Sequence, residues 1–314
     1  GGAVRSRIVA DREDEELLYA PLTSPPPAPG PGALCFSGEP RREERDRWEP
    51  GGTVLVSTDG GRSFREEPLP VSDTLTAAGK GPDPGDYRPR FSNVAVFDVA
   101  VHPWDPRIIY VATATGLWKS SDGAASFVRL PLRSEVNEKI EAVSAVALDP
   151  SDPDHLVAGA LRSVTIYDSF DAGEEWRVRF QGPSSRPGSR RRRSLGLGAL
   201  AFASARKVYA ATANSGHICG NAPAQRGVGL LRSDDYGESW KRCQARGLDG
   251  TVVVDLAVDP EEERHVIVAT ATGVYRSVDS GDSFQRILSF NRGNPGAALA
   301  FASAPAGTTL IASA

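Results

Sequence analysis

Short apolar runs recur along the chain, and each run is bounded by Gly, Pro or Asp. The clearest copy extends from Phe97 to Ser120, FDVAVHPWDPRIIYVATATGLWKS: an apolar stretch, a turn with Asp-Pro, a second stretch, a Gly turn and a third stretch. Related copies begin at Val143, Leu197 and Val253. β-branched and aromatic residues are typical of strands, and Gly, Pro and Asp of their ends. With one further strand after each copy, the pattern predicts four short strands per unit. Units of roughly 45–65 residues with four strands each indicate propeller blades.

A second motif lies between the third and fourth predicted strands of each unit. RSDDYGESW (Arg232 to Trp240) has four relatives, STDGGRSF, SSDGAASF, SFDAGEEW and SVDSGDSF, and the shared pattern is Ser-x-Asp-x-Gly-x-Ser-aromatic. Asp carboxylates hold tight turns through nearby backbone N–H groups, and Gly supplies a positive φ without steric cost. We therefore predict five structural aspartates: Asp59, Asp122, Asp171, Asp235 and Asp279. One carboxylate per turn is too few for Ca²⁺, so no metal site is expected.

These motifs resemble the Asp-box, or BNR-repeat, family of β-propellers. That family includes sialidases, xyloglucanase-type glycosidases, sortilin-like receptors and photosystem II assembly factors. The resemblance extends over nearly the whole chain. It implies an all-β propeller of four-stranded antiparallel blades with Asp-box turns, five of them complete and a sixth partial. It leaves the function open, because one fold hosts many chemistries.

The expected architecture is a single propeller domain, residues 1–314. Tyr19 aligns with Tyr110, which places the first two strands of blade 1 near the N-terminus. The expected bounds are about 3–68 for blade 1 with an inserted loop 23–50, 93–130 for blade 2, 142–180 for blade 3, 195–243 for blade 4 with an inserted loop 214–227, 252–288 for blade 5, and 297–314 for the partial blade 6. Either the chain is cut inside blade 6, or its C-terminal strands meet N-terminal strands and close the ring. The first interpretation is favoured, since proteins avoid unpaired strand edges.

Composition narrows the function classes. Lys and Arg total 36 and Asp and Glu 40, so the formal charge is −4, without the basic excess of a nucleic-acid-binding protein. No apolar run approaches the roughly 18 residues of a membrane helix.

The chain starts with Gly1 and contains no Met, so a processed, trimmed or partial chain is expected. No cofactor motif is present. Of three cysteines, Cys219 and Cys243 are a candidate disulfide, which would imply an oxidising compartment, and reduced thiols are the alternative.

Three insertions (Thr23–Pro50, Val71–Ser92 and Asn214–Gly227) are predicted to decorate one face, opposite the Asp turns. In the resembled family that face usually carries the binding cleft. Arg190, Arg191, Arg192 and Arg193 fall in a loop on the same face. Arg binds carboxylate or phosphate in bidentate geometry, so an acidic glycan, an acidic protein or a lipid headgroup would suit. A solvated basic loop is the alternative.

The first strand of each blade is expected to line a central channel. Asp98 and Asp255 occupy equivalent positions there, and Arg7 is the candidate at that place in blade 1. Two carboxylates across a channel are typical of glycosidase acid/base pairs, although channel carboxylates also simply bind water. The catalytic motifs of the resembled enzymes are absent: YRPRF does not match the sialidase Phe-Arg-Ile-Pro, and TATGLW and TATGVY lack the xyloglucanase-type Asp. The four histidines show no metal-ligand spacing and are expected to be solvent-facing turn residues.

The sequence therefore favours a non-catalytic binding or assembly scaffold that recognises a protein or an acidic glycan through the insertion-bearing face. The leading contacts would be Arg190 to Arg193 and the loop around Cys219. A glycoside hydrolase of sialidase-like architecture is the alternative, and a structural subunit completed by another chain is a third. The resemblance to secreted relatives implies an extracellular or periplasmic location.

Overall fold

The computed structural model describes most of the repeats that the sequence predicts. The described residues are 9–10, 17–23, 52–59, 62–69, 96–133, 141–161, 163–182, 195–204, 206–214, 229–248, 253–259, 261–270, 272–289, 299–304 and 307–312. Every regular element among them is a β-strand. None of these residues forms a helix long and apolar enough to span a membrane.

Five sheets have four strands each, paired antiparallel in chain order, and we call them blades 1 to 5. Blade 1 contains β1 (Val9–Ala10), β2 (Leu17–Thr23), β3 (Gly52–Thr58) and β4 (Arg65–Pro68). Blade 2 contains β5 (Val96–Val101), β6 (Ile109–Thr113), β7 (Gly116–Ser120) and β8 (Val128–Arg129). Blade 3 contains β9 (Val143–Leu148), β10 (Leu156–Ala160), β11 (Thr165–Ser169) and β12 (Arg177–Gln181). The prediction of four-stranded antiparallel units is confirmed.

Blade 4 contains β13 (Leu195–Ser204), β14 (Lys207–Asn214), β15 (Leu230–Ser233) and β16 (Lys241–Arg242). Blade 5 contains β17 (Val253–Val258), β18 (Val266–Thr270), β19 (Gly273–Ser277) and β20 (Gln285–Ser289). The sixth sheet has two strands among the described residues, β21 (Leu299–Ala304) and β22 (Gly307–Ala312). The predicted alignment of Tyr19 with Tyr110 holds, because Tyr19 pairs with Val56 and Tyr110 with Lys119, and each partner directly precedes the serine of its turn.

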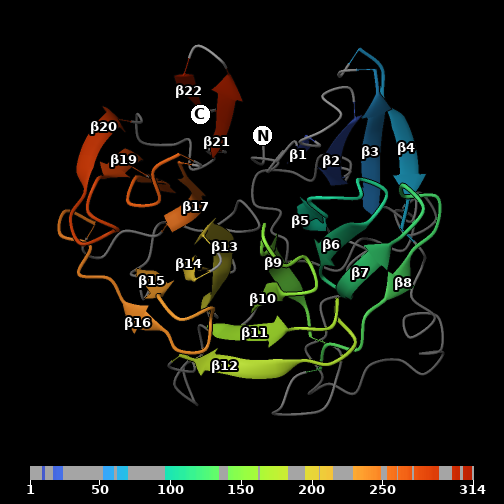
Figure 1. The fold of residues 1–314 in the computed structure, drawn as a ribbon, viewed down its shortest axis with the longest axis horizontal. Helices are drawn as coiled ribbons and strands as arrows, with labels where there is room; N and C mark the ends of the chain where they lie inside the picture. The colour runs from blue at the N-terminus through green and yellow to red at the C-terminus, as the bar shows by residue number, and fades with distance from the viewer. Residues whose placement is uncertain are drawn as a thin grey trace, which may run out of the picture.

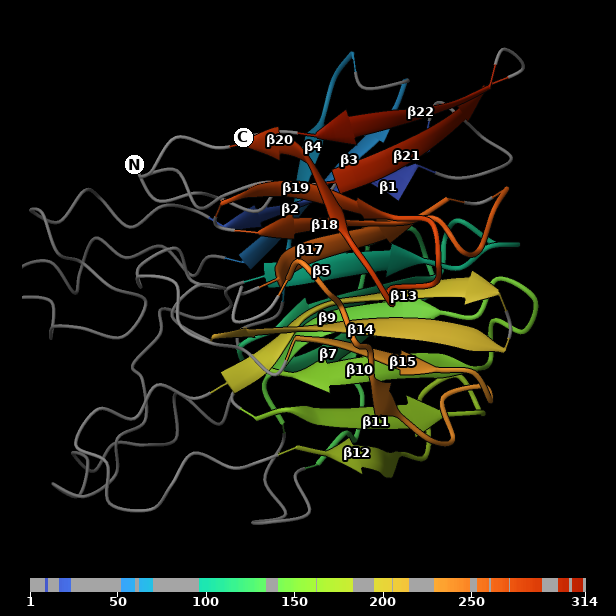
Figure 2. The same cartoon turned by 90° about the vertical axis from the view of Figure 1, so that its left-hand side faces the viewer.

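The sheets stand around a common centre, with first strands inside and fourth strands at the rim (Figure 1). Figure 2, which is turned by 90°, shows that strands such as β13 and β14 run roughly along the direction from which Figure 1 is viewed. In blades 2 to 5, the turn before the fourth strand lies beside the turn between the first two strands. Backbone hydrogen bonds such as Gly123 N to Arg107 O (2.9 Å) and Tyr236 N to Arg206 O (3.0 Å) join the two turns. We call the end of the ring that carries these turns the turn face.

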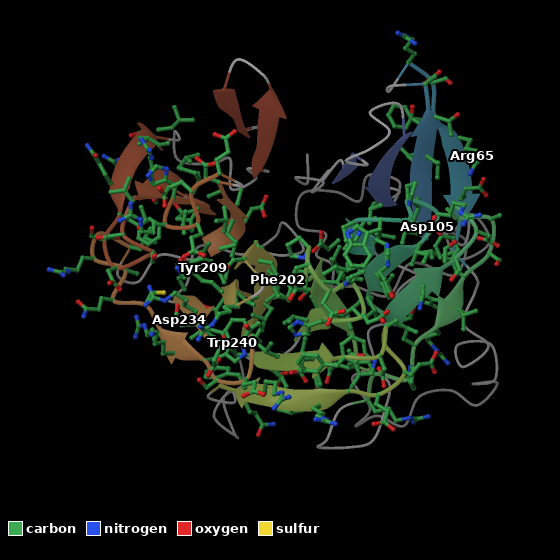
Figure 3. All side chains as sticks on the ribbon, in the orientation of Figure 1. Arg65, Asp105, Phe202, Tyr209, Asp234 and Trp240 are labelled. Atoms are coloured by element: carbon green, nitrogen blue, oxygen red, sulfur yellow. The ribbon has the colours of Figure 1, made fainter. Side chains whose placement is uncertain are left out.

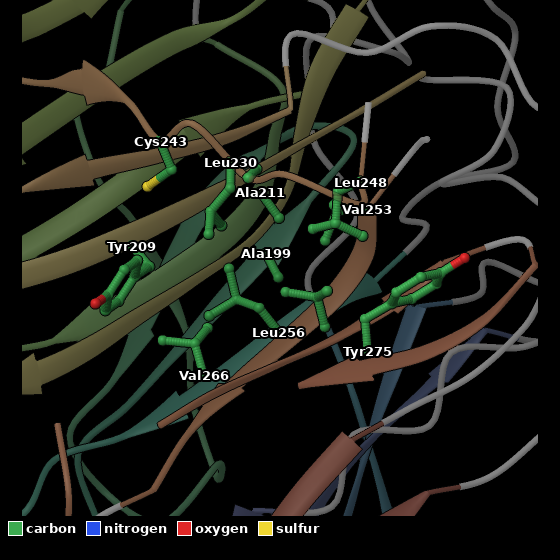
Figure 4. Close-up of a cluster of buried hydrophobic side chains, with 12 residues drawn as sticks. Ala199, Tyr209, Ala211, Leu230, Cys243, Leu248, Val253, Leu256, Val266 and Tyr275 are labelled. Carbon is green, nitrogen blue, oxygen red and sulfur yellow. The ribbon is translucent and has the colours of Figure 1, made fainter. Parts of the chain in front are cut away.

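The hydrophobic core lies between neighbouring blades, because side chains of a strand alternate between its two faces. Val111 of β6 packs toward blade 1, whereas its neighbours Tyr110 and Ala112 pack toward blade 3. In β14, Ala210 faces blade 3 while Tyr209 and Ala211 face blade 5. Figure 4 shows the cluster between blades 4 and 5. Each blade is therefore stabilised by its neighbours.

The innermost strands share one irregularity. In blades 2 to 5 the pairing of the first with the second strand shifts by one residue near the start of the first strand. In blades 2 and 5 the shift comes just before Asp98 and Asp255. A β-bulge of this kind re-aims one side chain and leaves a backbone group outside the ladder. The two candidate carboxylates therefore occupy special backbone positions.

Candidate functional site

The Ser-x-Asp turns repeat one hydrogen-bond pattern, which we describe at Asp122. Its Oδ1 accepts from Ser120 Oγ (2.8 Å) and from Ser126 N (2.9 Å), and its Oδ2 accepts from Ser126 Oγ (2.6 Å). The corresponding serine hydroxyls bond Asp59, Asp171, Asp235 and Asp279 at 2.6–2.8 Å. The hydroxyl and N–H of Ser126, together with the Ser120 hydroxyl, lower the pKa of Asp122 to about 2. These carboxylates are engaged in holding the turns.

In blades 2 to 5, two successive residues of the turn adopt positive φ. In the last copy these are Ser280 (φ 61°) and Gly281 (φ 87°). Ala124, which replaces the glycine in blade 2, has φ 74°, and its N–H still donates to Ser120 Oγ at 2.9 Å. The conformation is therefore imposed by the hydrogen bonds of the turn, and glycine makes it less costly. The closing aromatic residue is buried at Phe127, but Phe64 is 42% exposed.

Asp98 and Asp255 both lie inside the molecule, with 4% and 8% of their surface exposed. Asp98 Oδ1 accepts from Val99 N at 3.0 Å, and its Oδ2 accepts from Val146 N of blade 3 at 3.1 Å. Asp255 Oδ1 accepts from Leu256 N at 2.9 Å. Each carboxylate thus caps the backbone at its own bulge, and Asp98 also links two blades. The catalytic pairing of the two stays a prediction.

Several predicted site residues lie outside the described residues: Arg7, Arg190, Arg191, Arg192, Arg193, Cys35 and Cys219. The three insertions fall largely there as well. Cys243 is buried and has no disulfide partner among the described residues, and burial raises the pKa of its thiol to about 11. Its pairing with Cys219 stays a prediction. Within the described part of the chain, no three His, Cys, Asp or Glu side chains gather as a metal site would require.

The expectation of solvent-facing histidines is wrong for His155, which is 1% exposed. Its ring stacks on Phe170 at a centroid distance of 4.2 Å and meets the edge of Phe202 at 5.3 Å. Its Nδ1 lies 3.3 Å from Asp149 Oδ2. The two aromatic rings come from another turn and another blade, which explains why the local sequence did not reveal this burial.

The turn face carries exposed apolar side chains that sequence reasoning missed. Trp104 (62% exposed) lies in the turn between β5 and β6, and Phe170 (46%) and Tyr236 (44%) lie in the turns of blades 3 and 4. Phe170 and Tyr236 directly flank the turn aspartate. These positions vary between repeats, so the shared Ser-x-Asp pattern does not single them out.

A groove of about 410 Å³ opens on this face where blades 4 and 5 meet. Its lining residues are Ser204, Arg206, Lys207, Asp234 and Glu263. Lys207 Nζ of blade 4 contacts Glu263 Oε1 of blade 5 at 2.8 Å. That hydrogen bond lowers the pKa of Glu263. The groove therefore spans the two blades, and an ion pair holds its two sides together.

Asp234 lies on the outer side of blade 4 (Figure 3), where it pairs with Arg232 at 3.1 Å and with Lys241. Partial burial acts to raise its pKa, but these two cations leave the pKa below its ordinary value. Arg206 is different. It is exposed, its guanidinium lies over the Tyr236 ring at 5.7 Å from the centroid, and it has no ion pair among the described residues. Arg206 and Tyr236 together present a cation and an apolar ring to solvent.

Comparison with known proteins identifies the fold. No protein-family model matches the chain, and no curated protein matches it. Among solved structures, the GH74 enzyme of Niastella koreensis is similar, with 18% identity and a TM-score of 0.57 over 90% of this chain and 38% of that one. The GH74 xyloglucanase of Xanthomonas campestris shares 19% identity, with a TM-score of 0.57 over the same shares of the two chains. The chain has the β-propeller fold.

The propeller is also similar to an extracellular domain from B. thetaiotaomicron, that of the putative one component system BT4673. Here the identity is 13% and the TM-score 0.52, over 99% of this chain and 31% of that one. The propeller thus spans 38% or less of each of these three structures. At this level of identity the likeness shows the fold alone.

Proposed function

We propose that this propeller is a binding scaffold whose turn face takes an acidic segment of a protein partner at the groove between blades 4 and 5. The observation that carries this proposal is Arg206, the cation of the groove without an ion pair among the described residues, lying over the exposed ring of Tyr236. Arg and Tyr are enriched where protein surfaces meet. A ligand carboxylate would bond the guanidinium while an apolar side chain packs against the ring.

The contacts of the two inner carboxylates favour a scaffold over a hydrolase. A glycosidase needs two carboxyl groups facing one bond of the substrate, about 5–9.5 Å apart. Asp98 instead accepts hydrogen bonds from two backbone N–H groups, one of them in the next blade. The similar GH74 structures are enzymes, and the similar BT4673 structure is an extracellular domain. The fold alone therefore does not indicate catalysis.

A second binding surface, the insertion-bearing face, remains part of the proposal. Its leading contacts are Arg190 to Arg193 and Arg7, which lie outside the described residues, and its ligand would be an acidic glycan or an acidic protein. An extracellular or periplasmic location also belongs to the proposal. The similar extracellular domain supports it.

Peptide display tests the groove directly. A random peptide library would be selected on the intact chain, and the enriched sequences titrated against Arg206→Ala and Tyr236→Ala. Arg264→Ala is the matched control, because Arg264 is exposed on the same face and already paired with Glu262. We expect enrichment of acidic sequences and at least tenfold weaker binding by Arg206→Ala, about 1.4 kcal/mol. Equal loss in the control variant would contradict a specific site.

A hydrolase assay tests the alternative. The chain would be incubated with xyloglucan, other β-glucans and sialylated glycans, and released reducing sugar or sialic acid measured. The scaffold proposal expects no release. Turnover that disappears in Asp98→Asn or Asp255→Asn, with the variants still folded by circular dichroism, would establish the hydrolase and overturn the scaffold.

A further inference from the structure

The turn between the first two strands has the same backbone in blades 2, 3 and 5. One hydrogen bond closes it in each blade: His102 N to Ile108 O (2.9 Å), Asp149 N to His155 O (3.0 Å) and Asp259 N to His265 O (3.0 Å). The first residue of this turn is therefore an aspartate in blades 3 and 5, and a histidine in blade 2.

In blades 3 and 5 the aspartate side chain holds the turn. Asp149 Oδ1 accepts a hydrogen bond from Ser151 N at 2.8 Å, and Asp259 Oδ1 accepts one from Glu261 N at 3.0 Å. In both cases the donor is the N–H group two residues later in the chain. A short polar side chain that accepts from this N–H is a common way to stabilise a turn.

In blade 2 the imidazole of His102 takes the place of the carboxylate. Its Nδ1 accepts from Trp104 N at 3.2 Å and from Asp105 N at 3.0 Å. Asp105, which is labelled in Figure 3, marks this turn in blade 2. An imidazole nitrogen accepts only while it carries no proton, so the turn requires the neutral ring with its proton on Nε2.

A proton on Nδ1 would convert this acceptor into a donor. Two backbone N–H groups would then face a third N–H group, and all three would lose their hydrogen-bond partner. The aspartates of blades 3 and 5 accept in their ionised form, so the same proton uptake does not threaten their turns near neutral pH. Blade 2 thus has the one turn among these three whose hydrogen bonds depend on a histidine.

The surroundings of His102 favour the neutral ring. Partial burial is the main cause that lowers its pKa below the ordinary value of 6.5, and Lys119 of β7 acts in the same direction. Two carboxylates act to raise the pKa, Asp105 in the same turn and Asp154 in the neighbouring turn of blade 3. Asp105 is itself paired with Arg107, at 2.8 Å from Nη2. Proton uptake therefore needs a pH below 6.5.

Trp104 is the side chain that this turn presents to solvent. It is 62% exposed, and its ring stands at 82° to the ring of His102, with the two centroids 6.1 Å apart. Its backbone N–H donates to the same imidazole. The position of this exposed indole therefore depends on His102 through both its main chain and its ring.

We propose that His102 is a pH-sensitive switch of the turn face: proton uptake at Nδ1 opens the turn of residues 102–108 and displaces Trp104. Above the transition the indole is held on the turn face beside blade 3. Below it the two N–H groups are free to exchange with water and the indole moves. The switch lies in blades 2 and 3 and is independent of the groove at Arg206.

His102→Asp is the decisive variant, because it gives blade 2 the acceptor that blades 3 and 5 already use. Amide hydrogen exchange of Trp104 and Asp105 would be measured by NMR from about pH 7 to about pH 4.5, where histidine titrates. The Asp122 turn stays ionised there, since its pKa is about 2. We expect the protection of both amides to fall by about tenfold on acidification in the unaltered chain and to persist in His102→Asp.

Two controls complete the test. His265→Asn removes a histidine from the equivalent turn of blade 5, where Asp259 is the acceptor, and should leave the transition of blade 2 unchanged. Trp104→Phe supplies, by difference, the emission of Trp104 among the five tryptophans of the chain. That emission should change with the same midpoint as the exchange, and should not change in His102→Asp.

The opposite results would overturn the proposal. These are protection that stays constant in the unaltered chain, protection that falls equally in His102→Asp, and a transition that His265→Asn abolishes. Arg206→Ala is expected to retain the transition, so failure of the switch and failure of the groove proposal are separable. Circular dichroism at each pH confirms that every variant is folded.

Discussion

At Asp122, one carboxylate organises an entire turn. It accepts two hydroxyl hydrogen bonds and one backbone hydrogen bond within seven residues of chain, from Ser120 to Ser126. All three donors favour the ionised form, which is why the pKa of Asp122 falls from 3.8 to about 2. Proton uptake by this group therefore opposes folding.

The pH dependence of stability tests this residue. Because the pKa is lower in the folded state, the contribution of Asp122 is present above about pH 4 and is lost as the pH falls toward 2. We expect Asp122→Asn to lower the melting temperature most near neutral pH, with the difference from the unaltered chain shrinking as pH 2 is approached. Thermal unfolding at several pH values measures it.

Ser126→Ala provides the second arm of that experiment. The Ser126 hydroxyl is the largest cause of the lowered pKa. Its removal should shift the acid-induced loss of stability to higher pH. A difference between Asp122→Asn and the unaltered chain that stays constant down to pH 2 would contradict this role of the carboxylate.

At the scale of the element, the bulge in the innermost strand decides what Asp98 does. Directly after the bulge, the Asp98 carboxylate accepts a hydrogen bond from Val99 N and a second one from Val146 N of the next blade. The same bulge precedes Asp255. In blades 3 and 4 the equivalent places hold Ala145 and Ala199, so the bulge does not depend on the carboxylate. The Asp98 carboxylate is therefore not needed to form the bulge, and it links β5 to β9 by a hydrogen bond.

Replacement of Asp98 measures how much its carboxylate contributes to the free energy of unfolding. Asp98→Ala leaves two buried N–H groups without their acceptor, and we expect it to lower the free energy of unfolding by about 1–3 kcal/mol. Asp98→Asn retains one acceptor oxygen and should recover part of that loss. Urea unfolding followed by circular dichroism gives both values. An Asp98→Ala variant within about 0.5 kcal/mol of the unaltered chain would count against the cap.

Contacts inside a single turn could be predicted from the sequence, whereas contacts between blades could not. The turn at Asp122 joins residues four positions apart, so its motif is visible in the chain. Asp98 and Val146 are 48 positions apart, and their contact depends on how two sheets pack. The groove was missed for the same reason, because Lys207 and Glu263 come from different blades.

At the scale of the whole molecule, stability is distributed over the junctions. Four buried clusters lie between successive blades of the described structure. Cys243 belongs to the cluster between blades 4 and 5, where it is 5% exposed. Gly281 of blade 5 lies against it: a Cβ there would come within 3.3 Å of Cys243 Sγ and 3.0 Å of Leu230 Cδ2. This thiol becomes accessible when the two blades separate.

Thiol labelling reports on that separation. With a pKa of about 11 and a buried sulfur, Cys243 should react with maleimide very slowly in the native protein. We expect labelling in urea to follow the unfolding transition, as measured by mass spectrometry of the peptide that contains Cys243. Gly281→Ala, which crowds the junction at a φ of 87°, should accelerate labelling. Rapid native labelling would contradict the buried junction.

Three junctions between blades share a hydrogen bond that ends on a main-chain oxygen, and this bears on how such chains evolve. Arg65, Lys119 and Arg232 each donate to a carbonyl of the next blade, and the accepting residues, Gly123, Ala172 and Ser280, share no side-chain chemistry. A duplicated repeat carries its acceptor with it, and the repeat before it needs no compensating mutation. At this hydrogen bond a repeat can therefore be exchanged without a matching change in the acceptor side chain, whereas the buried clusters between blades still require side chains that fit one another.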